Sequence, residues 1–502
     1  MRSFVAVLTG SILVVGGAGL GCTAAGIRVG ADGGPIGTGS GGRGGSVGNN
    51  GSGGSMPMPM PTPPCENLQC KQSTCNKGSC TVPACTGGAR TTVSGIIMDP
   101  AGKVPLYNIT AYVPNKTVAD FIDGPSCDPC DPNTGTSLLS GQPIVVAKSD
   151  TFGKFTLGAT GLTDVPAGDN IPLVIQVGKW RRQYTIPKVT ACMDNPLTET
   201  DKIRLPRNQG EGHIPKFAIT TGQADALECL LRKVGIVDAE FTPEGGSGRI
   251  NLYAGGGGAA AYDMTVNAGM PFTPVNPWWD SVDNLKKYDI ILHACEGGQG
   301  SYGLMSNTPD PQSVKSPAAL QALQDFADLG GRVFASHWHT YWFEKGTPSF
   351  QSIATFTHNS GLPPMYDASI ETGFTTGQAL AQWMMNVGGS TVPGIVSLNQ
   401  RASTRMIDAA AGSNISQRWI YASTLNPQSV QYLSATTPIP GGHCGRVVLS
   451  DLHVSGDPSI PGSDQPVMPF PTGCVTTQLS PQEKVLEFML FDIASCVSPI
   501  VP

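Results

Sequence analysis

Residues 330–342, Gly-Gly-Arg-Val-Phe-Ala-Ser-His-Trp-His-Thr-Tyr-Trp, constrain the fold more than any other part of the chain. The two glycines predict a turn, residues 332–336 predict a short buried strand, and His337 and His339 follow directly. A short apolar strand of this kind is typical of a parallel sheet whose faces are covered by helices. Open sheets of that type bind ligands at the carboxyl ends of their strands, so we expect a functional site near the two histidines.

The pattern around this strand predicts an α/β domain over residues 213–497. Apolar strands alternate with amphipathic helices, and short alternating strands between 395 and 434 predict an antiparallel extension, which together indicate a flavodoxin-like α/β domain with an antiparallel β extension. The expected strands are 216–222, 249–253, 288–294, 332–336 and 446–451, and the expected helices are 225–235, 318–329, 376–387 and 481–495.

Residues 90–207 have a different pattern, with short apolar runs separated by turn residues. This pattern is typical of an all-β sandwich, and the Pro- and charge-rich stretch 194–212 is expected to link it to the α/β domain. A chain of 502 residues is also too long for one ordinary domain. We therefore expect a multidomain protein.

The N-terminus indicates export. Arg2 precedes an apolar run, and residues 1–22 have the pattern of a signal peptide. Leu20-Gly21-Cys22 resembles a bacterial lipobox, which implies lipidation of Cys22 and a membrane anchor in the outer membrane or periplasm; a plain secretory signal is the alternative. Residues 23–64 are rich in Gly, Ser and Pro and are expected to form a disordered tether.

The 14 cysteines fit an oxidising compartment. Five of them follow one another at intervals of five residues, and this segment, 65–89, fits a disulfide-bonded module better than a zinc site with close Cys-x2-Cys pairs. The five are Cys65, Cys70, Cys75, Cys80 and Cys85. A sixth partner could be Cys127, Cys130 or Cys192. If Cys22 is lipidated, 13 cysteines remain, so at least one thiol has no partner within the chain.

The charge balance argues against nucleic acid as a partner. The chain has 31 Lys and Arg residues against 37 Asp and Glu residues, and it has no block of like charge. Proteins that bind nucleic acid need clustered basic side chains to displace counterions from the phosphates.

Candidate site residues follow the predicted strands of the α/β domain. The His337-x-His339 spacing in an extended segment would put both imidazoles on one face, which suits a metal pair. Glu296, Asp451 or His453 could complete a zinc site with them, and an open coordination position would let zinc activate water. The candidate catalytic residues are His337, His453 and Glu296. The alternative is that these histidines only satisfy polar groups of the loops.

Cysteines and tryptophans add further alternatives. Cys229 and Cys295 could form a disulfide between adjacent loops, whereas a reduced Cys295 could act as a thiol nucleophile. Trp338, Trp342 and Trp180 could stack on a carbohydrate or an envelope polymer, or could instead pack against the protein.

Two family resemblances agree with these domains. The series Val-Ser-Gly-Ile, Asp-Pro-Ala-Gly-Lys-Val-Pro-Leu, Ala-Tyr-Val and Ser-Asp-Thr-Phe-Gly-Lys-Phe-Thr-Leu resembles the carboxypeptidase regulatory-like, transthyretin-like domain. Such domains are usually spacers or binding modules. The series Tyr-Asp-Ile-Ile-Leu-His-Ala-Cys-Glu-Gly, Leu-Gln-Asp-Phe-Ala-Asp-Leu-Gly-Gly-Arg-Val-Phe-Ala-Ser-His and Gly-Arg-Val-Val-Leu-Ser-Asp-Leu-His resembles the class I glutamine-amidotransferase-like superfold, in its trehalose-utilisation-type branch.

Departures from the second family matter for function. Amidotransferases place a cysteine in a Gly-x-Cys-x-Gly elbow, but here the elbow is Ser336-His337-Trp338. Their distal His-x-Glu is matched only by His453-Val454-Ser455, which lacks the carboxylate. The resemblance therefore does not imply glutaminase activity. The whole arrangement resembles uncharacterised envelope lipoproteins of myxobacteria-like organisms.

Three functions remain open from the sequence. The first is an envelope lipoprotein that acts as a binding or structural module on an amidotransferase-like fold without the catalytic cysteine. The second is a secreted hydrolase, with or without a metal, that acts on a carbohydrate or cell-wall-type substrate through His337, His339 and His453. The third is a thiol enzyme that uses Cys295.

Overall fold

The computed structural model describes residues 67–498, apart from short gaps. The gaps are 72–73, 77–78, 82–84, 134, 138, 161–162, 199–202, 299–314, 359–362, 364, 399–404, 409–414, 425–428 and 455–461. The signal peptide, Cys22, the tether and Cys65 lie outside the described residues. In the described part of the chain, no helix is long and apolar enough to cross a membrane.

The cysteine-rich segment begins with α1 (Asn67–Lys71), followed by an antiparallel pair of β1 (Thr74–Asn76) and β2 (Ser79–Thr81). Cys85 forms a disulfide with Cys192, which is one of the three partners that the sequence left open. This bond ties the cysteine-rich segment to the β region that follows.

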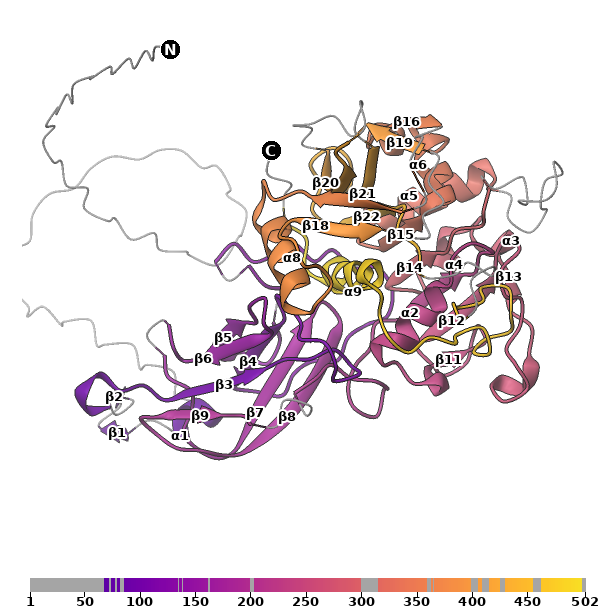
Figure 1. Cartoon of the computed structure of the whole chain (residues 1–502). Coiled ribbons are helices and arrows are strands. Elements are labelled where there is room, and N and C mark those ends of the chain that lie inside the picture. Colours follow the sequence, from indigo (N-terminus) through magenta and orange to yellow (C-terminus); the bar gives the residue numbers. More distant parts are fainter. Residues whose placement is uncertain are drawn as a thin grey trace, which may run out of the picture. The chain divides into compact units, whose positions relative to one another are not determined.

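The β region consists of two sheets (Figure 1). Apolar side chains from both sheets, such as Val93, Ala111 and Phe155, belong to one buried cluster. The three-stranded sheet has the order β6 (Lys154–Leu157), β3 (Thr92–Ile96) and β9 (Asp194–Pro196), and the four-stranded sheet has the order β5 (Pro143–Lys148), β4 (Thr110–Pro114), β7 (Gly168–Val177) and β8 (Trp180–Val189). The resemblance to carboxypeptidase regulatory-like domains stays a prediction.

Two features of the β region differ from the sequence-based expectation. Strand β8 was not expected, and β9 forms inside the stretch assigned to the linker, where Asp194 pairs in parallel with Thr92. The turn between β7 and β8 needs glycine at Gly178, because its φ is +51° and a Cβ there would lie 1.8 Å from the carbonyl oxygen of Ala494. This close contact packs the hairpin against the last helix of the chain.

The α/β region is built on one long mixed sheet (Figure 1). Its first six strands run parallel, and the last four continue antiparallel, as the sequence predicts. The parallel order is β11 (Phe241–Thr242), β12 (Ile250–Ala254), β10 (Phe217–Thr220), β14 (Ile290–His293), β15 (Arg332–Ser336) and β22 (Gly445–Ser450). The antiparallel order is β21 (Ser429–Thr437), β20 (Ser416–Ala422), β17 (Tyr366–Ile370) and β18 (Ile395–Leu398). In addition, β13 (Thr273–Pro274) pairs with β12, and β16 (Thr355–His358) pairs with β19 (Arg405–Asp408).

Helices connect the strands of the α/β region. The longer ones are α2 (Leu227–Val234), α5 (Pro317–Asp328), α8 (Thr375–Asn386) and α9 (Pro481–Ala494), and the short ones are α3 (Val275–Trp278), α4 (Val282–Leu285), α6 (Tyr341–Glu344) and α7 (Pro348–Gln351). Ser480 and Glu483 form a capping box at the start of α9, and α2 ends at Gly235 with φ +111°. Helix α2 begins two residues later than expected, so Asp225 lies in the loop that precedes it.

The β and α/β regions are joined covalently and by their cores. Disulfides connect Cys127 with Cys444 and Cys130 with Cys496. Trp180 of β8 packs against Phe217 of β10 and Phe491 of α9. Residues 61–502 form one compact unit, so the two regions share a core although their sequence patterns differ.

Candidate functional site

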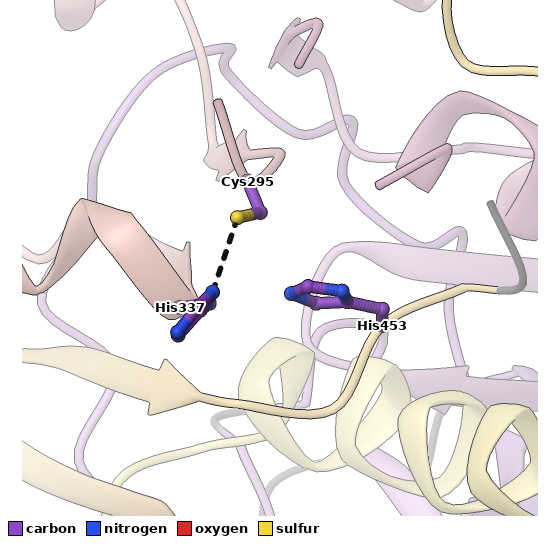
Figure 2. Close-up of side chains that lie close together, drawn as sticks. All are labelled: Cys295, His337 and His453. Atoms are coloured by element: carbon purple, nitrogen blue, oxygen red, sulfur yellow. Dashed lines mark hydrogen bonds between the residues drawn. The ribbon is translucent and has the colours of Figure 1, made fainter. Parts of the chain in front are cut away.

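Cys295, His337 and His453 come together at the carboxyl ends of three neighbouring parallel strands, β14, β15 and β22 (Figure 2). The Sγ of Cys295 lies 3.3 Å from Nδ1 of His337, and the ring centroids of His337 and His453 are 5.3 Å apart. One donor atom from each of the three side chains lies within 4.8 Å of the other two. All three side chains are buried, with at most 3% exposed.

The turn after β15 explains how His337 reaches this position. His337 has φ +38° and begins a 3-10 helix, η5 (His337–Thr340), directly after the strand. A residue other than glycine seldom adopts a positive φ, and backbone strain of this kind is concentrated at functional sites. Figure 2 shows the imidazole turned toward Cys295 and His453.

Cys295 is the free cysteine of the described residues. Burial raises the pKa of its thiol well above the usual range, although backbone N–H groups of Trp338 and Gly297 donate hydrogen bonds to the sulfur and lower the pKa. The nearby carboxylates of Asp225 and Glu296 raise the pKa further. The protein alone therefore favours the thiol form, whereas a bound cation would favour the thiolate that ligates metals.

Two buried carboxyl groups of the β10–α2 segment, Asp225 and Glu228, lie near the cluster. Burial raises the pKa of Asp225 to about 7 and that of Glu228 to about 8. Asp225 accepts hydrogen bonds from the loops that carry the cluster, whereas Oε2 of Glu228 is buried and has no hydrogen-bond partner among the described residues.

His339 is not placed to bind a metal, and the predicted pairing with His337 is wrong. Nε2 of His339 lies 2.9 Å from the carbonyl oxygen of Ala294, and Nδ1 accepts a hydrogen bond of 3.0 Å from Nε1 of Trp342. Burial, together with the charge of Lys315, holds the pKa of His339 well below its ordinary value. The prediction failed because the segment forms a 3-10 helix instead of an extended strand, so the two imidazoles diverge.

Glu296 and Asp451 also lie outside the three-residue cluster. Oε2 of Glu296 forms a buried ion pair of 2.8 Å with Lys315, and Oε1 accepts a hydrogen bond from the backbone of Gly256. Asp451 is buried directly after β22 and its backbone N–H donates to Gln431. A catalytic role for Glu296 and a metal role for Asp451 therefore stay predictions without support from this geometry.

Two of the three candidate tryptophans pack against the protein, which was the alternative to their stacking on a ligand. Trp180 and Trp342 are completely buried, Trp180 against Phe217 and Phe491, and Trp342 beside Trp279. Neither ring can stack on a ligand at the surface. The third candidate, Trp338, is half-buried, and its ring centroid lies 5.1 Å from that of His337, so it remains a candidate contact for a ligand.

The proposed Cys229–Cys295 disulfide is also wrong. Cys229 of α2 is bonded to Cys474, with the Cα atoms 5.2 Å apart. The sequence offered no spacing rule that could select Cys474 from so distant a part of the chain. The correction matters because it leaves the Cys295 thiol available for chemistry.

The disulfides together indicate an oxidising environment and an exported protein.

Comparisons with known proteins add little to this geometry. No protein-family model and no curated protein matches the chain. A ThuA-like protein from Bacteroides uniformis ATCC 8492 matches with a TM-score of 0.27 and 9% identity, over 47% of this chain and 81% of that chain. A 9R-lipoxygenase from Cyanothece PCC8801 matches with a TM-score of 0.12 and 18% identity, over 25% of this chain and 18% of that chain. These scores are too low to carry an argument, so the site is interpreted from its own residues.

Proposed function

We propose that this chain is an exported metalloprotein that binds one zinc-type ion through Cys295, His337 and His453 and uses it in hydrolysis. The observation that carries the proposal is that the three donor atoms lie within 4.8 Å of one another at adjacent strand ends. Thiolate and imidazole are the ligands that zinc prefers, and small rotations of the side chains would bring the donors to the bond lengths of about 2.0 to 2.3 Å that zinc requires.

The number and charge of the ligands favour a catalytic over a purely structural ion. Structural zinc sites usually have four protein ligands, whereas three protein ligands leave a fourth position for water. Cys295, His337 and His453 would hold the ion as one thiolate and two neutral imidazoles, and the net positive charge left on a divalent ion would lower the pKa of water in this site and so supply a nucleophile at neutral pH. Hydrolysis would break one bond of the substrate, with the hydroxyl group of the water going to one fragment and its proton to the other.

The substrate class in this proposal is a carbohydrate or cell-wall-type polymer. The support is the half-buried indole of Trp338 beside His337, because an aromatic ring at the edge of a site can stack on a sugar. The proposal includes a lipid on Cys22 that anchors the protein to the membrane, for which the support is the lipobox-like sequence.

Metal analysis of the purified protein tests the proposal. After exposure to zinc and removal of the excess, we expect about one equivalent to remain in the wild-type protein and less than about one tenth in Cys295→Ser, His337→Ala and His453→Ala. His443→Ala is the matched control, because His443 is a partly buried histidine of the β21–β22 turn outside the cluster. Circular dichroism confirms that each variant is folded. Zinc bound equally by the wild type and all three cluster variants would refute the site.

Cobalt gives a second readout of the same site. Co²⁺ bound through a thiolate has a charge-transfer band in the near ultraviolet, and we expect Cys295→Ser to lose it while His443→Ala keeps it. A cobalt complex without this band in the wild-type protein would exclude Cys295 as a ligand.

A thiol nucleophile is the second candidate, because Sγ of Cys295 lies 3.3 Å from a potential base, Nδ1 of His337. It ranks lower because it leaves His453 without a role and because burial raises the pKa of the thiol. Fast alkylation of Cys295 at neutral pH in metal-free protein, lost in His337→Ala but not in His453→Ala, would favour the thiol enzyme over the metalloprotein.

A further inference from the structure

The β10–α2 loop, residues 221–226, packs against the loop that carries Cys295. The backbone N–H of Ala224 donates to the carbonyl oxygen of Cys295 at 3.0 Å, and Nε2 of Gln223 donates to the carbonyl oxygen of Glu296 at 2.9 Å. Gly222 permits this approach, since a Cβ at that position would lie 2.2 Å from the carbonyl oxygen of Cys295. The loop therefore holds Asp225 in a fixed position beside the loop of Cys295.

The carboxylate of Asp225 contacts each of the three loops that carry the cluster. Its Oδ2 accepts a hydrogen bond of 2.6 Å from Oγ of Ser336, the residue before His337. Its Oδ1 accepts a hydrogen bond of 2.8 Å from the backbone N–H of Val454, the residue after His453. The backbone N–H of Cys295 also faces the same carboxylate and lowers its pKa.

We infer that Asp225 is the positioning residue of this site: through its hydrogen bonds to Ser336 and Val454, and through the packing of its own loop on Cys295, it fixes the loops that present Cys295, His337 and His453 at the spacing that a metal ion needs. Its known contacts are made to the neighbours and backbone of the three side chains, not to their donor atoms. Asp225 therefore acts on the geometry of the cluster. The metal readout rests on the proposed function, but the positioning role itself does not.

The chemistry of the donors explains why a carboxylate stands here. The Ser336 hydroxyl and the backbone N–H of Val454 both donate, and a carboxylate accepts at both oxygens. An asparagine has nearly the same shape but presents an NH₂ group on one side, so it would face a donor with a donor. Because Asp225 is fully buried, water cannot replace the hydrogen bond that is lost.

The test compares Asp225→Asn with Glu228→Gln, a matched change of a buried carboxyl group one turn along the chain. In competition titrations with Co²⁺ we expect Asp225→Asn to weaken binding by about 10- to 100-fold and to change the intensity of the visible cobalt bands, which report ligand geometry. Glu228→Gln should keep the wild-type affinity within about twofold and keep the spectrum. A folded Asp225→Asn protein with wild-type affinity and spectrum would overturn the inference.

Ser336→Ala tests the same mechanism without changing the charge, and it guards against a failure of Asp225→Asn to fold. We expect it to weaken Co²⁺ binding less than Asp225→Asn does, and we expect the double variant to bind no more weakly than Asp225→Asn alone, because both changes remove one shared hydrogen bond. Additive losses would show that the Ser336 hydroxyl does not act through Asp225.

Alkylation of Cys295 separates failure of this inference from failure of the proposed function. If the wild-type protein binds no Co²⁺, the metal proposal fails, but the positioning role still predicts faster alkylation of Cys295 by iodoacetamide in Asp225→Asn than in wild type or Glu228→Gln. Loosening of the loop would expose the buried thiol. Equal rates in all three proteins would overturn the positioning role as well.

Discussion

Two groups of buried histidines lie close together near the same strand ends, but they differ in what they can bind. The first is the cluster of Cys295, His337 and His453, and the second contains His293 and His339. His337 and His339 are two residues apart and both fully buried. His337 faces a free thiol and a second histidine, whereas both ring nitrogens of His339 are engaged by protein groups. Both residues are equally buried, and both belong to the same His-x-His motif. The kind of group that each ring contacts, a thiol for His337 and a backbone carbonyl and an indole for His339, is what distinguishes a candidate ligand from a packing residue.

The charges around the two clusters reinforce this difference. The ring of His339 stacks on that of His293, and burial together with the charge of Lys315 lowers the pKa of both residues. The Lys315 ammonium lies over the faces of Trp279 and Trp342 and forms an ion pair with Glu296. The group of histidines that contains His339 therefore already has a cation beside it. Cys295 instead lies near the carboxyl group of Asp225, which forms no ion pair within the described residues and would favour a cation near the sulfur.

The largest expected effect comes from breaking the ion pair between Glu296 and Lys315, which lies beside His339. Glu296→Gln keeps the shape of the side chain but removes the charge opposite the buried Lys315, so the free energy of unfolding should fall by about 3 kcal/mol in urea denaturation. The double variant Glu296→Gln with Lys315→Met removes both charges and should recover most of the loss. A single variant as stable as the wild type would show that Glu296 does not stabilise the ammonium.

A smaller effect separates the two neighbouring histidines. His339→Ala removes two buried hydrogen bonds and a stacked ring, so it should lower the free energy of unfolding of metal-free protein by about 2 to 3 kcal/mol while zinc binding remains. His337→Asn should change it by less than about 1 kcal/mol, because asparagine tolerates positive φ, but should abolish zinc binding. If His339→Ala loses zinc and His337→Asn keeps it, the assignment of the two histidines is reversed.

The sequence was sufficient to place the site but not to orient its side chains. Alternating apolar strands and helices predicted the parallel sheet, and the rule that ligands bind at strand ends pointed to the loops that carry Cys295, His337 and His453. Side-chain direction after a strand depends on a single backbone angle, here the φ of +38° at His337. No local pattern predicts that angle, so the His-x-His spacing alone predicts His339 as a ligand although its ring turns away from His337.

Long-range partners were the other part that the sequence could not supply. The bond from Cys229 to Cys474 spans 245 residues, and the hydrogen bond from Val454 to Asp225 spans 229. Spacing rules act over a few residues and cannot choose between such partners. The burial of Trp180 has a similar cause, because the rings that cover it, Phe217 and Phe491, lie in the α/β region.

The smallest effect concerns pH and again distinguishes the two clusters. Burial lowers the pKa of His293 from 6.5 to about 3 in the folded protein, so between these values the unfolded chain binds the extra proton and stability is lost as pH falls. Burial raises the pKa of Asp225 to about 7 and that of Glu228 to about 8, so these carboxyls bind protons in the folded protein first and oppose that loss. The wild-type curve is the sum of both terms, and His293→Asn isolates the histidine term. Between about pH 7 and about pH 5.5, the free energy of unfolding of wild type should fall relative to the variant by about 1 kcal/mol, as measured by urea denaturation at each pH. Parallel curves for the two proteins would mean that His293 is not held neutral, and the distinction between an internally satisfied cluster and a ligand-binding one would lose its electrostatic basis.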